Sequence, residues 1–350
     1  MSFSVGIVGL PNVGKSTLFK ALTKIPVDIA AYPFTTIHPN VGVVHVPDER
    51  LEKIAEIVKP EKITPTIIEF VDIAGLVKDA HKGEGLGNQF LAHIRNCDAI
   101  LEVVRVFEDP NVENVLGEIN PEKEIEVVRV ELLMKDLETL ENLLSKIEKD
   151  VKKDKGALKK IEFFKKIKDW VSQGKLVSEI NLTEEEKLEV KEYQFLTQKP
   201  VLYLLNTNGG KGLKPEPPST GRHPVHLEMN LRDEVELSEL SETEARELGL
   251  KSEIDQLIIS CYNILDLITF FTVAGGKETR AWTLERGFKA SRAGRVVHSD
   301  FEEKFIRAEV IPWQKLVEVG SWHKARELGW LKTVGHDYVV QDGDIIEFKI

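Results

Sequence analysis

A glycine-rich stretch decides the fold of this chain: Gly9-Leu10-Pro11-Asn12-Val13-Gly14-Lys15-Ser16. It lies between the apolar run Val5–Val8, which predicts a strand, and a helical pattern that starts at Ser16. This spacing between a strand and a helix is typical of a P-loop, in which backbone N–H groups surround a β-phosphate. The stretch therefore predicts a phosphate site in an α/β fold, and the alternative is a glycine turn that only caps a helix.

The residues of this loop have separate tasks. Lys15 is expected to reach the β- and γ-phosphate oxygens, and the Ser16 hydroxyl to coordinate Mg²⁺. The phosphate-binding set is expected to be Asn12, Val13, Gly14, Lys15, Ser16 and Thr17.

A second anchor for the metal follows the apolar run 67–71, which predicts a strand ending in the carboxylate of Asp72. Asp72 would hold Mg²⁺ mostly through a water, and the N–H of Gly75 could bind the γ-phosphate. Thr36, preferred over Thr35, would close over the γ-phosphate and the metal. The expected metal set is Ser16, Thr36 and Asp72, and the expected catalytic set is Lys15, Thr36 and Gly75. The alternatives are an Asp that caps a turn, threonines that form a turn and a loose glycine loop.

The chain divides by pattern into three parts. Residues 1–120 and 197–266 alternate apolar runs with helical patterns, which indicates an α/β nucleotide-binding domain with a mostly parallel sheet, including a displaced strand at 200–205. Residues 121–196 predict an antiparallel helical hairpin, and a Thr183–Glu186 capping box starts a further helix. Residues 267–350 are β-rich, and Asp342-Gly343 predicts a hairpin turn. The hairpin seams are expected to contain Leu133, Leu137, Leu140, Leu144, Ile147 and Val151 on one helix and Leu158, Ile161, Phe164, Ile167 and Val171 on the other.

Composition limits the class of protein. A formal net charge of -11 excludes a surface built throughout to coat nucleic acid, so no DNA partner is expected and any RNA contact must be local. Cys97 and Cys261 lack metal-ligand spacing and suit a reducing compartment. Neither a charged leader nor a long apolar stretch is evident, so we expect a cytoplasmic protein without a membrane span.

Several segments together resemble a known family. They are Gly9–Thr17, Asp72–Val77, Gly83–Phe90, Arg280–Thr283 and Asp342–Asp344. In this order they look like YchF-type Obg-like ATPases. The resemblance implies a G-domain with a coiled-coil insert, a C-terminal TGS domain of β-grasp shape, ATP preferred over GTP, and binding to the large ribosomal subunit. By analogy with potassium-stimulated relatives of this superfamily, an oxygen of Asn12 could help to coordinate a K⁺ ion beside the phosphates. The equally open alternative is that the Asn12 side chain only caps backbone groups.

The catalytic water has no evident orienting group. Leu76 stands where Ras-type GTPases place a glutamine, and an apolar side chain cannot orient water by hydrogen bonding. The family often carries a histidine where this chain has Asn114, and Asn cannot act as a general base. His81 is a candidate substitute, although a single loop histidine is usually solvated. We therefore expect slow intrinsic hydrolysis that depends on positioning or on a partner.

Recognition of the base falls at Asn206-Thr207-Asn208-Gly209. GTPases place a carboxylate at the fourth position, and its absence should cost guanine about 1.5 to 3 kcal/mol. The Asn206 amide could bind adenine through N7 and N6, or it could only hold its own loop together. The expected base-side set is Asn206 and Thr207, with ATP as the nucleotide.

Two basic segments offer a place for ribosomal RNA. Lys149–Lys168 holds nine lysines against three acidic residues, and Lys277–Arg295 is also basic. The alternative for the first is a solvated helical end. The favoured function is a ribosome-associated ATPase switch. The alternatives are a GTPase in translation or ribosome assembly, a non-enzymatic adaptor gated by nucleotide, and a metabolic phosphotransferase.

Overall fold

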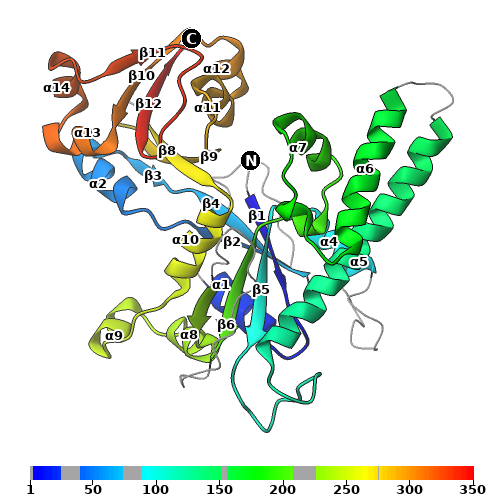
Figure 1. The fold of residues 1–350 in the computed structure, drawn as a ribbon. Helices are drawn as coiled ribbons and strands as arrows, with labels where there is room; N and C mark the ends of the chain where they lie inside the picture. Colours follow the sequence, from blue (N-terminus) through cyan, green and yellow to red (C-terminus); the bar gives the residue numbers. More distant parts are fainter. Residues whose placement is uncertain (1–2, 25–39, 74–87, 151–155, 208–225, 275) are drawn as a thin grey trace.

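The computed structural model describes residues 3–24, 40–73, 88–150, 156–207, 226–274 and 276–350 (Figure 1). The described strands form two six-stranded sheets. The first has the order β2-β4-β1-β5-β6-β7. Its strands are β1 Phe3–Val8, β2 Val41–His45, β4 Ile67–Asp72, β5 Ala99–Arg105, β6 Val201–Asn206 and β7 His226–Met229.

The first sheet is mostly parallel, as predicted. Only the edge strand β2 runs antiparallel to its neighbour, β4, among the pairs of this sheet. Every residue of β5 is buried, which fits a central strand covered on both faces. The predicted displaced strand is β6, which pairs with β5. The core contains side chains from α1 Lys15–Thr23, α4 Asn88–Arg95 and α10 Ile254–Ile264, while α8 Leu231–Leu237 and α9 Glu242–Glu247 follow β7.

The insert is a helical arm. α5 Pro121–Asp150 and α6 Gly156–Ser172 lie side by side (Figure 1), and their buried seam contains Leu140, Phe164 and Ile167. The chain returns through η2 Val177–Glu179, α7 Glu184–Lys191 and η3 Leu196–Gln198. The predicted capping box is confirmed, because Thr183 Oγ1 accepts from the Glu186 N–H and the Glu186 carboxylate accepts from the Thr183 N–H.

One seam residue was predicted wrongly. Leu158 is 55% exposed, since it lies in the first turn of α6 at the far end of the arm. Val151, the last residue expected on the first seam, lies outside the described residues.

The second sheet has the order β11-β10-β12-β8-β9-β3. Its strands are β3 Lys62–Thr64, β8 Leu267–Ala274, β9 Glu278–Glu285, β10 Arg307–Pro312, β11 Lys332–Val334 and β12 Asp344–Lys349. The helices near it are α2 Glu49–Val58, α11 Ala290–Val297, α12 Ser299–Glu303, α13 Trp313–Val319 and α14 Trp322–Glu327. Adjacent residues of β8 face opposite ways, so Phe270 packs with α11 and Phe271 with α2 and α13.

Residues 47–66 leave the first sheet and join the second. β3 pairs parallel with β9 as an edge strand, and Leu51 and Ile54 of α2 are buried beside Phe271. The packing of α2 and β3 depends on contacts with residues more than 200 positions away, which local patterns do not reveal.

The predicted hairpin at Asp342-Gly343 is also wrong. β12 pairs with β10 and β8, and Val339 forms only an isolated bridge with Lys289. The turn itself is present, with Gly343 at φ 88°. Asp342 explains the difference, because its Oδ1 accepts from the Thr269 N–H of β8 and ties the turn to that strand.

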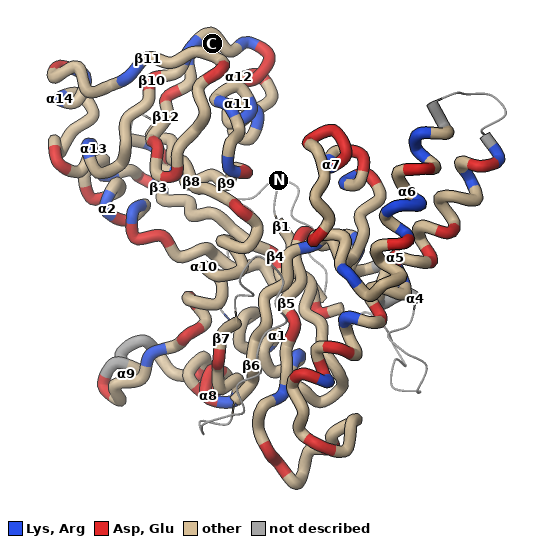
Figure 2. Tube along the Cα trace, viewed as in Figure 1, with Lys and Arg blue, Asp and Glu red and all other residues tan. Residues whose placement is uncertain are grey.

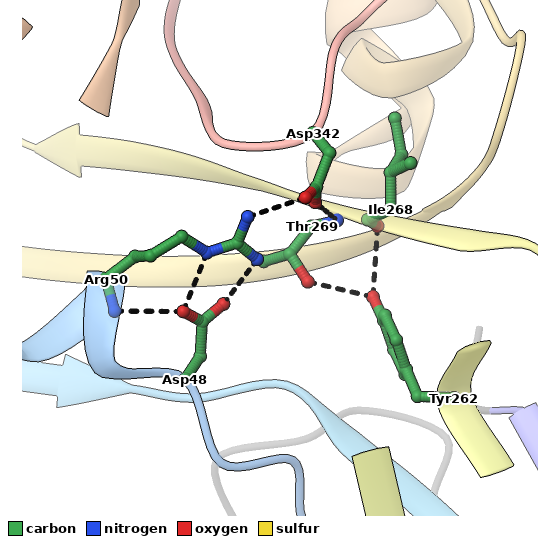
Figure 3. Close-up of polar contacts among 6 residues, drawn as sticks. All are labelled: Asp48, Arg50, Tyr262, Ile268, Thr269 and Asp342. Atoms are coloured by element: carbon green, nitrogen blue, oxygen red, sulfur yellow. Dashed lines mark hydrogen bonds and ion pairs between the residues drawn. The ribbon is translucent and has the colours of Figure 1, made fainter. Parts of the chain in front are cut away.

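A polar network connects α2 and α10 with β8 of the second sheet and with the turn at Asp342 (Figure 3). Asp48 caps α2 and makes paired contacts with the Arg50 guanidinium, Nε to Oδ1 and Nη2 to Oδ2, each at 2.8 Å. Arg50 also donates to Asp342 Oδ2 at 2.7 Å. From α10, the Tyr262 hydroxyl donates to the Ile268 carbonyl and lies 3.0 Å from Thr269 Oγ1. The network borders a cleft of about 850 Å³ between α2, α10 and the second sheet.

Among the described helices, none has both the length and the apolar character needed to cross a membrane.

Candidate nucleotide-binding site

The glycines of the P-loop are required by its geometry. Gly9 has φ 138° and Gly14 has φ 113°, values that L side chains rarely adopt. A Cβ at Gly9 would lie 2.3 Å from the Val103 carbonyl oxygen, and one at Gly14 would lie 2.5 Å from Asn206 Nδ2. The loop therefore packs tightly against β5 and the end of β6, at the edge of the parallel strands where α/β folds bind ligands.

Lys15 lies inside the curve of this loop. Its ammonium donates to the carbonyl oxygens of Gly9 at 3.0 Å and Leu10 at 2.6 Å. Burial lowers the pKa of Lys15 to about 8, while Asp72 and Glu124 oppose that shift. A buried ammonium at a helix N-terminus is suited to a phosphate ligand, which would neutralise its charge.

The predicted metal residues Ser16 and Asp72 come from neighbouring elements. Ser16 is exposed in the first turn of α1, and Asp72 ends β4 beside Ile7 of β1. No group of three or more His, Cys, Asp or Glu side chains suited to a metal occurs in the described part of the chain. Mg²⁺ does not require one, because it is usually held by one or two protein oxygens together with phosphates and waters. The hydroxyl and the carboxylate therefore fit Mg²⁺.

Asn206 connects the P-loop to the end of β6 and the start of α8. It is 6% exposed, its Nδ2 donates to the Val13 carbonyl at 2.8 Å, and its Oδ1 accepts from the Leu231 N–H at 3.3 Å. Thr207 continues the strand end through its N–H, which donates to the Met229 carbonyl. Asn206 thus holds three segments together, and its amide retains a second hydrogen and a second lone pair for a ligand.

Asn12 contacts the segment that follows β5. Its φ is 65°, and its Nδ2 donates to the Glu113 carbonyl at 3.3 Å, so the amide group makes a backbone contact as one prediction allowed. Asn114, next along that segment, accepts from the Leu116 N–H at 2.7 Å. Thr17 is half-buried in the first turn of α1.

Several predicted residues lie outside the described part of the chain. These are Thr35, Thr36, Gly75, Leu76, His81 and Gly209. The structure therefore brings together the P-loop, Asp72 and Asn206, and the roles assigned to the others remain predictions.

Sequence reasoning missed the charged residues buried beneath the P-loop. Glu102, Arg105 and Glu124 are 2% to 3% exposed. One signal was present, since Glu102 and Arg105 interrupt the apolar run of β5. Glu124 had no such signal, because the first turn of a helix commonly contains exposed acidic residues.

Comparisons with known proteins agree with this geometry. Residues 4–148 match a family model described as a 50S ribosome-binding GTPase. Residues 267–350 match the YchF GTPase C-terminal model, described as a protein of unknown function.

Relatives match across the chain. The "Ribosome-binding ATPase YchF" of Bacillus subtilis is 44% identical over 364 residues, covering 100% of this chain and 99% of the relative. The protein of the same name from Haemophilus influenzae is 43% identical over 362 residues, with the same coverage. A solved structure, the Schizosaccharomyces pombe YchF GTPase, has a TM-score of 0.89 and 34% identity, covering 99% of this chain and 98% of that one. On this identity and coverage, the chain belongs to the YchF family.

Proposed function

We propose that this chain binds ATP and hydrolyses it to ADP and phosphate, as a nucleotide-controlled switch that associates with the ribosome. The P-loop geometry supports the proposal, since Gly9 and Gly14 have positive φ angles and the Lys15 ammonium donates to the Gly9 carbonyl within the same loop. The names of the bacterial relatives support ATP and the ribosome. The test is phosphate release from ATP by purified protein. Release no faster than from Lys15→Met would contradict the proposal.

Residues Ser16, Thr36 and Asp72 would hold Mg²⁺ in this proposal, and the ion would supply charge neutralisation for the phosphates. Asn12 is the proposed neighbour of a K⁺ ion. Lys15 would bind the β- and γ-phosphate oxygens, Thr36 would close over the γ-phosphate, and the Gly75 N–H would bind the γ-phosphate as well. The oxygen donors Ser16 and Asp72 support this assignment. The Asp72→Asn variant should lose most magnesium-dependent nucleotide affinity, and titration of Mg²⁺ at fixed ADP would detect it.

Adenine preference is a separate part of the proposal. Asn206, already held by Val13 and Leu231, is supported as a rigid contact for the base, and Thr207 continues the strand end beside it. Calorimetry of ATP, ADP, GTP and GDP with magnesium should show tenfold or stronger adenine preference, a gap of about 1.4 kcal/mol. The Gly209→Glu variant tests whether a carboxylate restores guanine binding. Equal or guanine-favouring affinities would sink the adenine assignment.

A GTPase is the second candidate, because a family model and the fission yeast structure bear that title. The same titration separates it from an ATPase. Leu76 and Asn114 support a slow intrinsic rate, and single-turnover kinetics would measure it. A turnover without ribosomes that matches the fully activated rate would contradict that part of the proposal.

The proposed partner surface on the ribosome has two parts, the arm tip Lys149–Lys168 and the segment Lys277–Arg295. Basic residues cluster on α6 and near α11 (Figure 2). On the arm, Lys165 and Lys168 make exposed ion pairs with Glu148 and Glu141, and Lys160 pairs with the half-buried Glu189. Exposed pairs contribute only about 0 to 1 kcal/mol each, so phosphates could replace the glutamates.

Cosedimentation with 50S particles tests this surface. Binding at moderate salt should weaken as salt rises, because phosphate contacts release counterions. Charge-reversal of Lys165 and Lys168 should weaken it further, whereas reversal of Lys53 on α2 serves as a control. Absence of cosedimentation with the large subunit at moderate salt would refute the partner.

The proposal also includes a cytoplasmic location and a division into three domains. These are a G-domain of residues 1–120 and 197–266, a coiled-coil insert of residues 121–196, and a TGS domain of residues 267–350.

A further inference from the structure

Glu124 occupies an unusual place for an acidic residue in the first turn of a helix. Asn120 caps α5, since its Oδ1 accepts from the Lys123 N–H at 3.0 Å and its carbonyl from the Glu124 N–H at 3.0 Å. Glu122 and Glu126 are exposed, whereas Glu124 is 3% exposed. A buried carboxylate is costly unless other groups bind it, so its partners indicate its purpose.

The partner of Glu124 is the end of the central strand. Glu124 Oε2 accepts from the backbone N–H of Arg105 at 3.0 Å, where β5 ends beside Asn206 of β6. Burial raises the pKa of Glu124, while this N–H, the Arg105 charge and the Lys15 charge oppose the shift. Burial also raises the pKa of Glu102, a second buried carboxyl, which lies on β5, and the like charge of Glu124 raises it further.

Arg105 extends the connection to the P-loop. Its guanidinium donates to the carbonyl oxygens of Phe107 at 3.1 Å, Val112 at 3.0 Å and Asp109 at 3.3 Å, which closes the 107–113 segment around one side chain. The Glu113 carbonyl at the end of that segment accepts from Asn12 of the P-loop. Hydrogen bonds therefore run from the first turn of the arm helix to the loop that would hold the phosphates.

We propose that Glu124 is a positioning residue of the nucleotide site, which holds the end of β5 and, through Arg105 and the 107–113 segment, fixes the P-loop at Asn12. Glu124 touches no nucleotide in this role. Through these contacts, the orientation of the arm helix α5 and the conformation of the P-loop depend on each other. The positioning role rests on the proposed nucleotide site, and the predicted change in kcat/KM rests on the proposed ATP hydrolysis.

Substitutions of Glu124 separate positioning from mere stability. The Glu124→Gln variant keeps an amide oxygen for the Arg105 N–H and should stay within about threefold of the wild type. Both Glu124→Ala and Glu124→Asp, whose carboxylate is one methylene short, should raise the Kd of ADP and lower kcat/KM for ATP by about tenfold. Glu126→Gln, on the exposed face of the same helix, is the matched control and should change neither constant.

The measurements are calorimetric ADP binding with magnesium and steady-state phosphate release, both well below the unfolding midpoint of each variant. A purely structural role would lower the midpoint and leave both constants of the folded protein unchanged, which would overturn the proposal. Glu124→Gln falling as far as Glu124→Ala would also overturn it, because charge and not the hydrogen bond would then matter. If Glu124→Ala does not fold, the ADP affinities of Glu124→Asp and Glu124→Gln decide, since the proposal requires weaker binding in Glu124→Asp only. ADP binding tests the positioning role even if the wild type hydrolyses no ATP, so the two proposals fail separately.

Discussion

At Gly14 the backbone has φ 113°, and a Cβ would lie 2.5 Å from the Asn206 amide nitrogen. The same amide nitrogen donates to the Val13 carbonyl. A Cβ at position 14 would therefore clash with the group that also hydrogen-bonds the P-loop. Gly14 is therefore required both by its backbone conformation and by the tight packing around it. Substitutions at this scale should separate those two effects.

We expect Gly14→Ala to weaken ADP binding at least about tenfold and to destabilise the protein by about 2 kcal/mol, because strained φ and a clash add. Gly117→Ala is the control, since Gly117 has φ 76° but open space around its Cβ position. It should cost about 1 kcal/mol and leave ADP binding unchanged. Urea unfolding and calorimetry measure both quantities. Equal ADP affinity in the two variants would show that the clash does not matter.

Cys97 gives a residue-scale prediction about pH. Burial raises the pKa of its thiol to about 12, although the charge of Lys199 opposes the shift. The unfolded thiol titrates near pH 8.5, so this contribution to stability is complete below that pH and is lost between about pH 8.5 and 12, with a slope of about 1.4 kcal/mol per pH unit.

The Cys97→Ala variant should therefore show a shallower decline of unfolding free energy between about pH 8.5 and 10 than the wild type. Urea unfolding at a series of pH values measures the two slopes. The native thiol should also resist alkylation at about pH 8. Fast alkylation of folded protein would contradict the assigned burial.

At the scale of elements, Asp136 joins the first arm helix, α5, to the chain that returns from the arm at η3. It lies on α5 with a fully buried side chain, and it accepts from the Leu196 and Thr197 N–H groups at 2.8 Å and from Thr197 Oγ1 at 2.7 Å. The seam of leucines packs the two helices, but this carboxylate sets where the returning chain meets α5. Glu138, two positions later on α5, is exposed and not buried as Asp136 is.

We expect Asp136→Ala to destabilise the protein by about 2 to 4 kcal/mol, because the buried N–H donors of Leu196 and Thr197 lose their acceptor. Glu138→Ala, the control, should cost less than about 0.5 kcal/mol. Chemical unfolding gives both values. A loss below about 1 kcal/mol for Asp136→Ala would mean that water or backbone groups replace the carboxylate.

At the scale of the whole molecule, the second sheet is built from two parts of the chain that are far apart in sequence. β3 completes it beside β9, and α2 covers one face. The segment that contributes them lies between β2 and β4, and β4 ends at Asp72 of the nucleotide site. A further exposed contact joins Lys191 of α7 to Glu285 of β9 at 3.7 Å. The C-terminal sheet is thus attached next to the strand that carries the proposed metal ligand.

The Arg50–Asp342 contact tests this attachment. Removing either side chain should destabilise the protein by about 1.5 to 3 kcal/mol, since a charge-assisted hydrogen bond between α2 and the turn before β12 is lost. The double variant Arg50→Ala with Asp342→Ala should cost less than the sum of the single ones. Unfolding free energies of the four proteins give the coupling, and Lys53→Ala is the control for surface charge on α2. Additive effects would mean that the Arg50–Asp342 contact adds nothing to the apolar packing of α2 on the second sheet.

Local patterns determined much of this protein. The glycine spacing between a strand and a helix predicted the P-loop, and the apolar periodicities predicted the mostly parallel sheet and the helical arm, because each depends on neighbours within a few residues. Only the tertiary structure decided that α2 and β3 join the C-terminal sheet, that Asp342 binds Thr269 in place of forming a hairpin, and that Glu124 lies beneath the P-loop. Those contacts join residues that are far apart in sequence, or bury a charge that a solvated helix turn would display equally well, so their free energy comes from packing and hydrogen bonding that no local pattern encodes.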